Sequence, residues 1–162
     1  MAMLNMAAFR KKEAYIRQIA ALLRRRKFMQ AYRLSGEFAA AFPSELASRY
    51  LLAKSAFWAG KYREAAQEGR KAFNLARGSD AVPCAIVEAS ALFMLGEYDE
   101  GLSLLSKLDS HGFAEVESLR FAFAVAKGDE KGAVAMLDRI YRLNLKAAEK
   151  LLGSLLGFRR NR

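Results

Sequence analysis

Apolar residues recur at helical spacing along most of the chain, and short breaks interrupt them at regular intervals. Between Leu46 and Gly78, small and apolar side chains return every three to four residues on both sides of a break at Gly60. This spacing predicts two amphipathic helices that fold back on each other. Glycine accepts the left-handed conformation that closes a helix, so Gly60 and Gly78 are expected to end these two helices.

The break recurs at intervals of 32 to 36 residues. A small residue stands five positions after the start of each break. A helix pair this short cannot bury its apolar face alone, so the recurrence predicts that successive pairs stack. The breaks are Arg26-Lys27-Phe28, Gly60-Lys61-Tyr62, Gly96-Glu97-Tyr98 and Gly128-Asp129, and the small residues are Ala31, Ala65, Gly101 and Ala133.

These four breaks and their period resemble the tetratricopeptide repeat (TPR) family, although the family's tryptophan and much of its leucine pattern are missing. The resemblance covers residues 12 to 145. It implies an all-α fold, a right-handed α-solenoid of about four helix pairs in a single TPR-like domain over residues 1–162. The expected repeats span 12–45, 46–81, 82–113 and 114–143, and an amphipathic closing helix follows over 145–158.

Local signals set the expected boundaries within this frame. Residues 1–11 should lead in as a helical turn or a disordered arm, with the first helix over 14–23 and the second over 28–41. Pro43 stops that second helix, and Ser44 is expected to cap the next one. Pro83 is tolerated in the first turn of its helix, and the following helix is expected over 99–108.

Composition limits the cellular setting. Cys84 is the only cysteine, so an internal disulfide is excluded and a reducing compartment, cytoplasmic or nuclear, is expected. No apolar run is expected to reach the roughly 18 residues of a membrane span, and no membrane partner is expected. The apolar start of the chain precedes its charges, which is the wrong order for a secretory signal. A mitochondrial presequence would also be Arg-rich, but the same residues fit the first repeat.

The net charge of +10 is distributed unevenly. Residues 1–80 contain 16 Lys and Arg against 6 Asp and Glu, whereas residues 88–138 contain 4 against 10. Opposite charges on one molecule favour complementary association, with another copy or with a partner. The alternative is a solvated helical surface that has no partner.

A basic patch of four consecutive residues, Arg24, Arg25, Arg26 and Lys27, forms the first break. One interpretation is a surface that contacts nucleic-acid phosphates. The other is a solvated turn, because helix C-termini favour cations. Only Phe28 and Tyr32 lie close to this patch in the sequence as aromatic residues that could stack on bases. Proteins that bind single strands typically have more such residues.

No constellation for catalysis is present in the sequence. Cys84 and the only histidine, His111, are far apart and fall on different predicted elements. There is no glycine-rich phosphate loop, and acidic pairs such as Asp99-Glu100 begin helices, where they complement the helix dipole. We therefore expect a protein that is not an enzyme, with no catalytic residue, no cofactor and no metal site.

The remaining prediction is a binding surface for protein. In the family that the chain resembles, the first helix of each repeat lines a groove, and tryptophan is enriched among binding hot spots, which favours Trp58 as an anchor. An apolar segment, laid in as a helix, would suit such a groove. The alternative is that the aromatics are core between repeats. The predicted groove consists of Leu23, Arg24, Tyr50, Lys54, Phe57, Trp58, Ile86, Ser90, Phe93 and Met94.

A narrower resemblance concerns the scaffold subunits of the anaphase-promoting complex, a cell-cycle ubiquitin ligase. Their N-terminal repeats are similar to Ser44-Glu45, Tyr50–Ala53 and Gly60–Tyr62 here, and Gly101 and Leu143-Asn144 point the same way. Those subunits are far longer, and the resemblance implies a homodimer formed through the N-terminal repeats. The expected function is a non-catalytic protein-interaction scaffold. The alternatives are a chaperone or adaptor for an apolar segment, of the bacterial secretion type, and a basic RNA-binding helical-repeat module.

Overall fold

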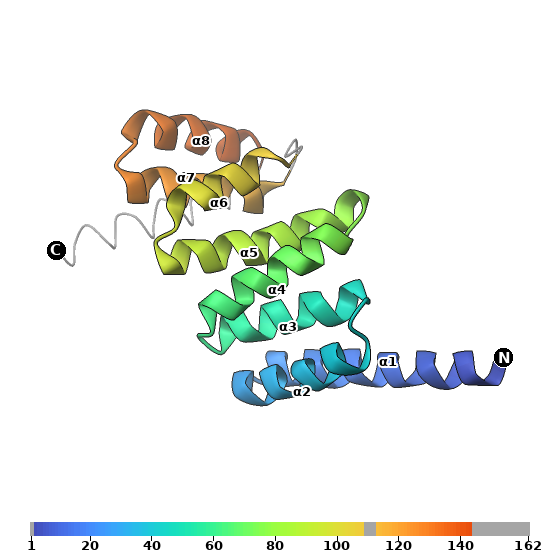
Figure 1. Cartoon of the computed structure of the whole chain (residues 1–162). Coiled ribbons are helices and arrows are strands. Elements are labelled where there is room, and N and C mark those ends of the chain that lie inside the picture. The colour runs from blue at the N-terminus through green and yellow to red at the C-terminus, as the bar shows by residue number, and fades with distance from the viewer. Residues whose placement is uncertain (1, 109–112, 144–162) are drawn as a thin grey trace. The chain divides into compact units, whose positions relative to one another are not determined.

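The computed structural model describes residues 2–108 and 113–143, and this part of the chain is helical with short connections (Figure 1). Two compact units divide the chain, unit 1 (Met1–Leu95) and unit 2 (Gly96–Arg162). Unit 1 contains α1 (Ala2–Arg24), α2 (Phe28–Ala41), α3 (Leu46–Trp58), α4 (Tyr62–Leu75), the 3-10 helix η1 (Gly78–Asp80) and α5 (Ala81–Leu95). Unit 2 contains α6 (Tyr98–Ser106), α7 (Ala114–Lys127) and α8 (Glu130–Leu143).

Two expectations fall on residues outside the described ranges. These are the turn that contains His111 and the closing helix over 145–158. The single domain over 1–162 stays a prediction.

Each helix of unit 1 packs against the next, and the odd-numbered helices also meet, α1 with α3 and α3 with α5 (Figure 1). The core between them is built mainly from alanine, and Phe38 and Ile19 are its largest fully buried side chains. Small side chains let the helix backbones approach closely. At Gly69 on α4 the approach is close, because an added Cβ would lie 3.0 Å from the Cβ of Glu88 on α5.

Three of the predicted breaks close by the same hydrogen bond, from a backbone N–H to the carbonyl five residues earlier. Lys27 donates to Leu22, Lys61 to Ala56 and Asp129 to Ala124, at 2.8 to 2.9 Å. The residue before each donor is left-handed, with φ of +75° at Gly60 and +76° at Gly128. Gly96 has φ of +79°. The first break differs, because the non-glycine Arg26 occupies this conformation, with φ of +56°.

Several expected boundaries are wrong. The first helix begins at Ala2 instead of residue 14, so the lead-in follows the helical alternative, and α6 ends at Ser106 instead of residue 108. Helix α4 ends at Leu75, so Gly78 does not end it; this glycine has positive φ but begins η1. Ser44 does not cap α3 either, because the N-cap residue is Glu45, which makes no side-chain capping bond.

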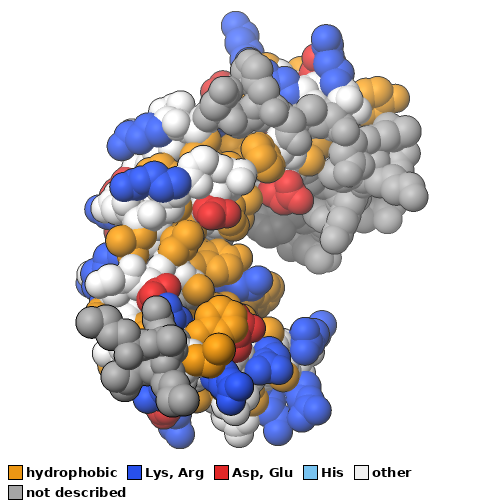
Figure 2. Space-filling view, turned by 90° about the vertical axis from the view of Figure 1, so that its right-hand side faces the viewer, with side chains coloured by type: hydrophobic (Ala, Val, Ile, Leu, Met, Phe, Trp, Pro, Cys, Tyr) orange, Lys and Arg blue, Asp and Glu red, His pale blue; other side chains and the backbone are white. Residues whose placement is uncertain are grey.

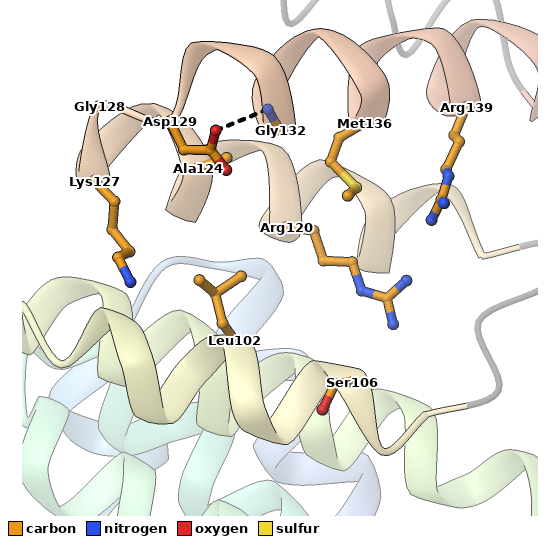
Figure 3. Close-up of a pocket in the computed structure, with 10 residues that line it drawn as sticks. All are labelled: Leu102, Ser106, Arg120, Ala124, Lys127, Gly128, Asp129, Gly132, Met136 and Arg139. Carbon is orange, nitrogen blue, oxygen red and sulfur yellow. Dashed lines mark hydrogen bonds between the residues drawn. The ribbon is translucent and has the colours of Figure 1, made fainter.

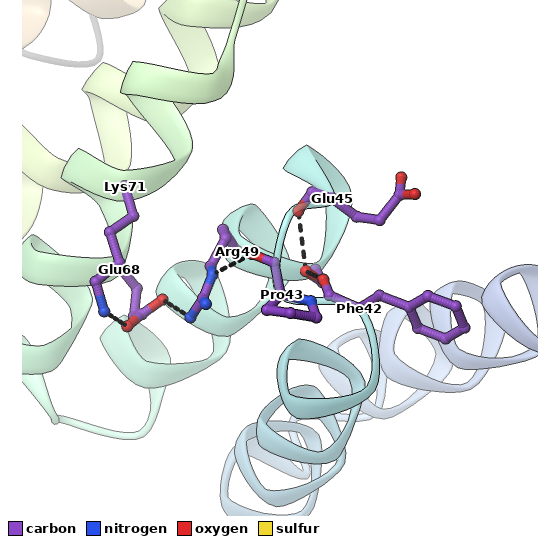
Figure 4. Close-up of polar contacts among 7 residues, drawn as sticks. Phe42, Pro43, Glu45, Arg49, Glu68 and Lys71 are labelled. Carbon is purple, nitrogen blue, oxygen red and sulfur yellow. Dashed lines mark hydrogen bonds and ion pairs between the residues drawn. The ribbon is translucent and has the colours of Figure 1, made fainter.

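Polar contacts connect the α2–α3 connection, α3 and α4 (Figure 4). Ser48 donates its hydroxyl to the carbonyls of Phe42, at 2.6 Å, and Glu45, at 2.9 Å. These bonds fix the start of α3 to the C-cap residue of α2, Phe42, and to the N-cap residue of α3, Glu45. One residue later, Arg49 donates to the carbonyl of Pro43 and to Glu68 on α4, both at 2.9 Å. The connection after Pro43 is therefore fixed from α3, by residues downstream of the expected cap.

Unit 2 packs around two aromatic side chains. The ring of Phe123 on α7 lies over Gly101 on α6, where an added Cβ would be 2.2 Å from the ring's Cζ. On the other side of α7, Phe121 and Ala124 form a cluster with Ala133 and Ile140 of α8. The small residue predicted at position 101 is thus required by the close approach of Phe123.

One helical stretch in the described residues, Gly78–Leu95, is long and apolar enough to cross a membrane by length and composition, contrary to our expectation. A core helix passes the same test. This stretch contains α5, which packs along α4, and 39% of it is buried. It also carries Glu88, whose carboxylate Oε1 accepts a hydrogen bond from Arg70 of α4 at 2.9 Å. These contacts make it a packed helix of unit 1.

Candidate functional site

Six residues of the predicted groove form two matching sets on neighbouring helices of unit 1. Each set has the spacing i, i+4, i+7, which lies on one face of a helix. All six side chains are half-buried, whereas the core positions of α3 and α5 are other residues. We call these six residues the inner row: Tyr50, Lys54 and Phe57 on α3, with Ile86, Ser90 and Phe93 on α5.

The two polar members of the inner row differ in what they offer a partner. The ammonium of Lys54 lies 5.7 Å from the centroid of the Tyr50 ring, a cation–π contact. The hydroxyl of Ser90 donates to the carbonyl of Ile86 at 2.7 Å, so its donor is already used within α5. The row therefore presents mainly aromatic and aliphatic surface with one positive charge.

The other predicted groove residues are more exposed or lie at helix ends. Trp58 is the last residue of α3 and Met94 is the last but one of α5, and they are 52% and 50% exposed. Leu23 is half-buried and Arg24 is exposed at the end of α1. The structure thus joins six of the ten predicted residues in one row and places Trp58 in a different neighbourhood.

That neighbourhood is an aromatic cluster formed by Phe28, Phe57, Trp58 and Tyr62. The indole of Trp58 stacks on the Phe28 ring, with centroids 5.6 Å apart and planes 19° apart. Phe57 meets Trp58 edge-on at 5.5 Å, and Tyr62 lies 5.6 Å from Phe57. Sequence reasoning missed the stacking because Phe28 and Trp58 are 30 residues apart, on different predicted repeats.

The basic patch lies beside this cluster. Lys27 immediately precedes Phe28, and the α1–α2 and α3–α4 turns lie on the same side of unit 1, at the left in Figure 1. The α3–α4 turn and the start of α4 add two exposed cations. We call the six exposed residues the turn cations: Arg24, Arg25, Arg26, Lys27, Lys61 and Arg63. Within the described ranges, none of the six forms an ion pair.

Four other cations in the described part of unit 1 are paired with carboxylates. Lys12 bonds Glu45 at 2.5 Å, and Glu68 accepts from both Arg49, at 2.9 Å, and Lys71, at 2.6 Å (Figure 4). Figure 2 views the molecule from the right-hand side of Figure 1 and shows Lys and Arg side chains gathered around hydrophobic ones over its lower helices. Unit 1 contains 16 Lys and Arg against 7 Asp and Glu. The excess of positive charge therefore belongs to this unit.

Three glutamates are buried, which sequence reasoning did not anticipate. Glu68, Glu88 and Glu117 are 2% to 7% exposed. Each bonds an arginine: Arg49, Arg70 and Arg120, respectively. The sequence contains only a weak indication of their burial, because a glutamate near the apolar stripe of an amphipathic helix is normally expected to be exposed to solvent. The first two pairs join neighbouring helices, the third lies within α7, and none is arranged as an acid–base site.

A pocket of about 600 Å³ lies within unit 2 (Figure 3). Several of its polar groups are engaged: Arg120 donates to the carbonyl of Leu105 at 2.6 Å, Lys127 pairs with Asp99, and Asp129 accepts from the N–H of Gly132 at 2.9 Å. The pocket was not predicted. Its lining residues are Leu102, Ser106, Arg120, Ala124, Lys127, Gly128, Asp129, Gly132, Met136 and Arg139.

Two titratable groups of unit 1 are perturbed. Burial, and then the negative charge of Asp80, raise the pKa of the Cys84 thiol from 9.0 to about 11. The pKa of Tyr32 is raised, first by the hydrogen bond that it donates to Glu64 at 2.5 Å and then by burial. A thiol with a raised pKa is a poor nucleophile at neutral pH. Over the described residues, no group of three His, Cys, Asp or Glu side chains could hold a metal ion.

Comparisons with known proteins show the fold. No protein-family model and no curated protein matches the chain. Among solved structures, it is similar to MamA, residue 41 to the end, from Desulfovibrio magneticus RS-1, a TPR-like protein; the TM-score is 0.72 at 14% identity, covering 94% of this chain and 97% of that one. The MamA RS-1 ArsTM double mutant gives 0.71 at 14% identity, covering 93% and 96%. The fold class is therefore an all-α solenoid of TPR-like helix pairs, as the sequence predicted.

Proposed function

We propose that this chain is a non-catalytic scaffold that binds other proteins through the inner row of unit 1. One observation carries the proposal: aromatic and aliphatic side chains occupy matching positions on two helices in contact, yet they stay half-buried. Core packing would bury them and a solvated face would carry charge instead. A half-buried apolar row is typical of a surface that a partner completes.

The chemistry of the row defines the kind of partner. An amphipathic helix could lay apolar side chains against Phe57, Ile86 and Phe93. A carboxylate at the edge of that helix would meet the ammonium of Lys54, the one charge in the row. Stacked helix pairs provide extended surfaces for such segments, which agrees with the fold.

We further propose that one partner is a second copy of the chain. Unit 1 is strongly basic, whereas the described residues of unit 2 contain eight Asp and Glu against six Lys and Arg. Such asymmetry favours association between copies. Cys84 is free and buried, which suits the reducing, cytoplasmic or nuclear compartment that we propose for the scaffold. A place in the anaphase-promoting complex gains no support from the comparisons.

Light scattering coupled to size exclusion tests the proposal. We expect a dimer of about twice the 18.1 kDa chain mass. Replacing Tyr50 and Phe93 together by alanine should raise the dimer dissociation constant at least about tenfold, because truncating aromatic contacts at an interface typically costs more than about 1 kcal/mol.

A matched control is Tyr141→Ala, which removes an aromatic side chain that is 59% exposed on α8, outside the row. The control should leave the dimer unchanged. Monomers at all protein concentrations would contradict self-association. Equal weakening by the control would remove the inner row as the interface.

A further inference from the structure

We propose that unit 1 binds single-stranded nucleic acid at the end that carries the α1–α2 and α3–α4 turns, which we call the turn end. Trp58 is the stacking platform for a base, and the turn cations contact the phosphates. This site adjoins the inner row, with which it shares Phe57. It combines two features that lie far apart in the sequence, the α1–α2 turn and the end of α3.

The aromatic cluster orients the platform. Phe28 stacks nearly parallel to one face of the Trp58 indole, and Phe57 meets the indole edge-on. These contacts hold the indole in place while 52% of the residue remains exposed. An ordered, half-exposed indole offers a flat surface to a base, and such stacking does not depend on which base is present.

The cations around the platform are unneutralised. Among the described residues the six turn cations have no carboxylate partner, whereas Arg49, Arg70 and Lys71 of the same unit each bond a buried glutamate. Glu64 is the acidic residue nearest in sequence to either turn, and its carboxylate accepts the hydroxyl of Tyr32. The turn end therefore concentrates positive charge, which a phosphate backbone complements.

The backbone at Arg26 supports the same conclusion. Residues other than glycine rarely adopt a φ of +56°, and glycine occupies this left-handed conformation at the other predicted breaks. Arginine supplies a positive charge at this position, although the left-handed backbone costs it more free energy than it would cost glycine. A solvated turn without a ligand gives no reason for that choice.

A strand of nucleotides fits this surface better than an acidic peptide does. Phosphates would satisfy the cations in either turn, and each base has a flat aromatic face for the exposed indole. A chain of glutamates offers the charge without the face. We therefore assign the site to single-stranded nucleic acid and use an acidic peptide as the competing ligand.

The test uses the full chain and labelled 12-nucleotide oligo(U) and oligo(dT), measured by fluorescence anisotropy. Trp58 is the only tryptophan, so quenching of its emission reports a stacked base directly. Binding should weaken with salt at a slope of about −0.7 per phosphate contact, or about −4 when all the turn cations engage. Twelve-residue polyglutamate should bind more weakly and should not quench. Tight binding of either oligonucleotide with quenching supports the proposal, and the two arms show whether the sugar matters.

Three variants localise the site. Trp58→Ala should weaken binding at least about fivefold, because stacking on one aromatic residue contributes about that much or more. Arg25→Ser with Lys27→Ser should weaken binding and reduce the salt slope by about 1.4. The matched control, Lys107→Ser with Lys131→Ser, removes the same charge from exposed positions of unit 2 and should change little. Circular dichroism at 222 nm verifies that each variant is folded.

Three results would overturn the proposal. The first is no binding of either oligonucleotide at 50 mM salt. The second is polyglutamate binding of equal strength with equal quenching, which would assign the surface to an acidic polypeptide. The third is equal weakening by the control variant, which would mean that net charge alone attracts the strand.

Discussion

Unit 1 and unit 2 both bring two helices together at a glycine, but the glycine serves a different purpose in each. At Gly69 in unit 1, the backbone of α5 itself approaches, with the Cα of Glu88 3.1 Å from the position of an added Cβ. At Gly101 in unit 2, the fully buried ring of Phe123 fills the space where a side chain would be. The first glycine allows backbone contact, and the second provides a recess for a ring.

Charge is also used differently in the two units. In unit 1, Arg70 of α4 reaches Glu88 on the following helix. In unit 2, Arg120 pairs with Glu117 on its own helix, three residues away, and its second nitrogen bonds the carbonyl of Leu105 on α6. Both arrangements place an arginine at a helix seam. We call the line of contact between two packed helices a seam. The comparison teaches that one repeat pattern tolerates two kinds of seam: one where small residues let the backbones approach, and one where an aromatic ring fills the space beside a glycine.

The largest expected effect breaks the recess in unit 2. Gly101→Ala should destabilise the protein by about 2–3 kcal/mol, because its Cβ would overlap the fully buried ring of Phe123, and overpacking of this kind costs about 1–3 kcal/mol. Gly69→Ala should stay within about 1 kcal/mol of the wild type. Its closest contacts are 3.0–3.1 Å, and alanine recovers about 1 kcal/mol of helix propensity. Urea unfolding followed by circular dichroism measures both.

A rescue variant separates overlap from other causes. Gly101→Ala combined with Phe123→Leu should be more stable than Gly101→Ala alone, because the smaller side chain vacates the recess. Equal effects of Gly101→Ala and Gly69→Ala would contradict the distinction between the two seams.

The next largest effect concerns the charged seam of unit 1. Arg70→Met should cost about 2 kcal/mol, since it removes an arginine from a carboxylate whose side chain is only 3% exposed. Removing one partner of a buried pair costs about 3–5 kcal/mol, and the 54% exposure of Arg70 lowers that figure. Adding Glu88→Leu should recover part of the loss. A double-mutant cycle with no coupling between the two residues would show that the pair does not hold the seam.

Much of the helical framework could be predicted because it depends on local chemistry. The breaks at Gly60, Gly96 and Gly128 need a residue with left-handed backbone, and a glycine in the sequence indicates such a position. The missed boundaries depend on distant contacts: the fixed connection after Pro43 depends on Ser48 and Arg49, which lie beyond the expected cap.

The candidate sites were less predictable for the same reason. The inner row could be proposed from spacing on single helices, and its role stays a prediction. The stacking of Trp58 on Phe28 joins two repeats, and no local pattern indicates it. The buried Glu88 was also missed, because its partner Arg70 lies 18 residues away and on another helix.

The smallest expected effect is a pH dependence confined to the seam of unit 1. Cys84 is buried there with Ala72 and Ala76. Its folded pKa of about 11 lies above the ordinary value of 9.0, so the buried thiol contributes stability below about pH 9 that is lost as pH rises through 11. Between pH 8 and pH 10 the wild type should lose about 1 kcal/mol more than Cys84→Ala.

Comparing the two proteins at each pH cancels the contribution of Tyr32, whose raised pKa acts in the same alkaline range. Parallel pH profiles for the wild type and Cys84→Ala would contradict the assignment to this thiol.

The strained turn at Arg26 sets folding against binding at a single position. Glycine there would relax a backbone whose φ is +56° and would raise stability by about 0.5–1 kcal/mol. The same change would remove one of the six turn cations from the proposed nucleic-acid site. A selection for thermostability alone would therefore drive this turn towards glycine, as at the other breaks, and would erode ligand affinity as a by-product. Arginine at position 26 is thus a compromise between backbone stability and the proposed binding of nucleic acid.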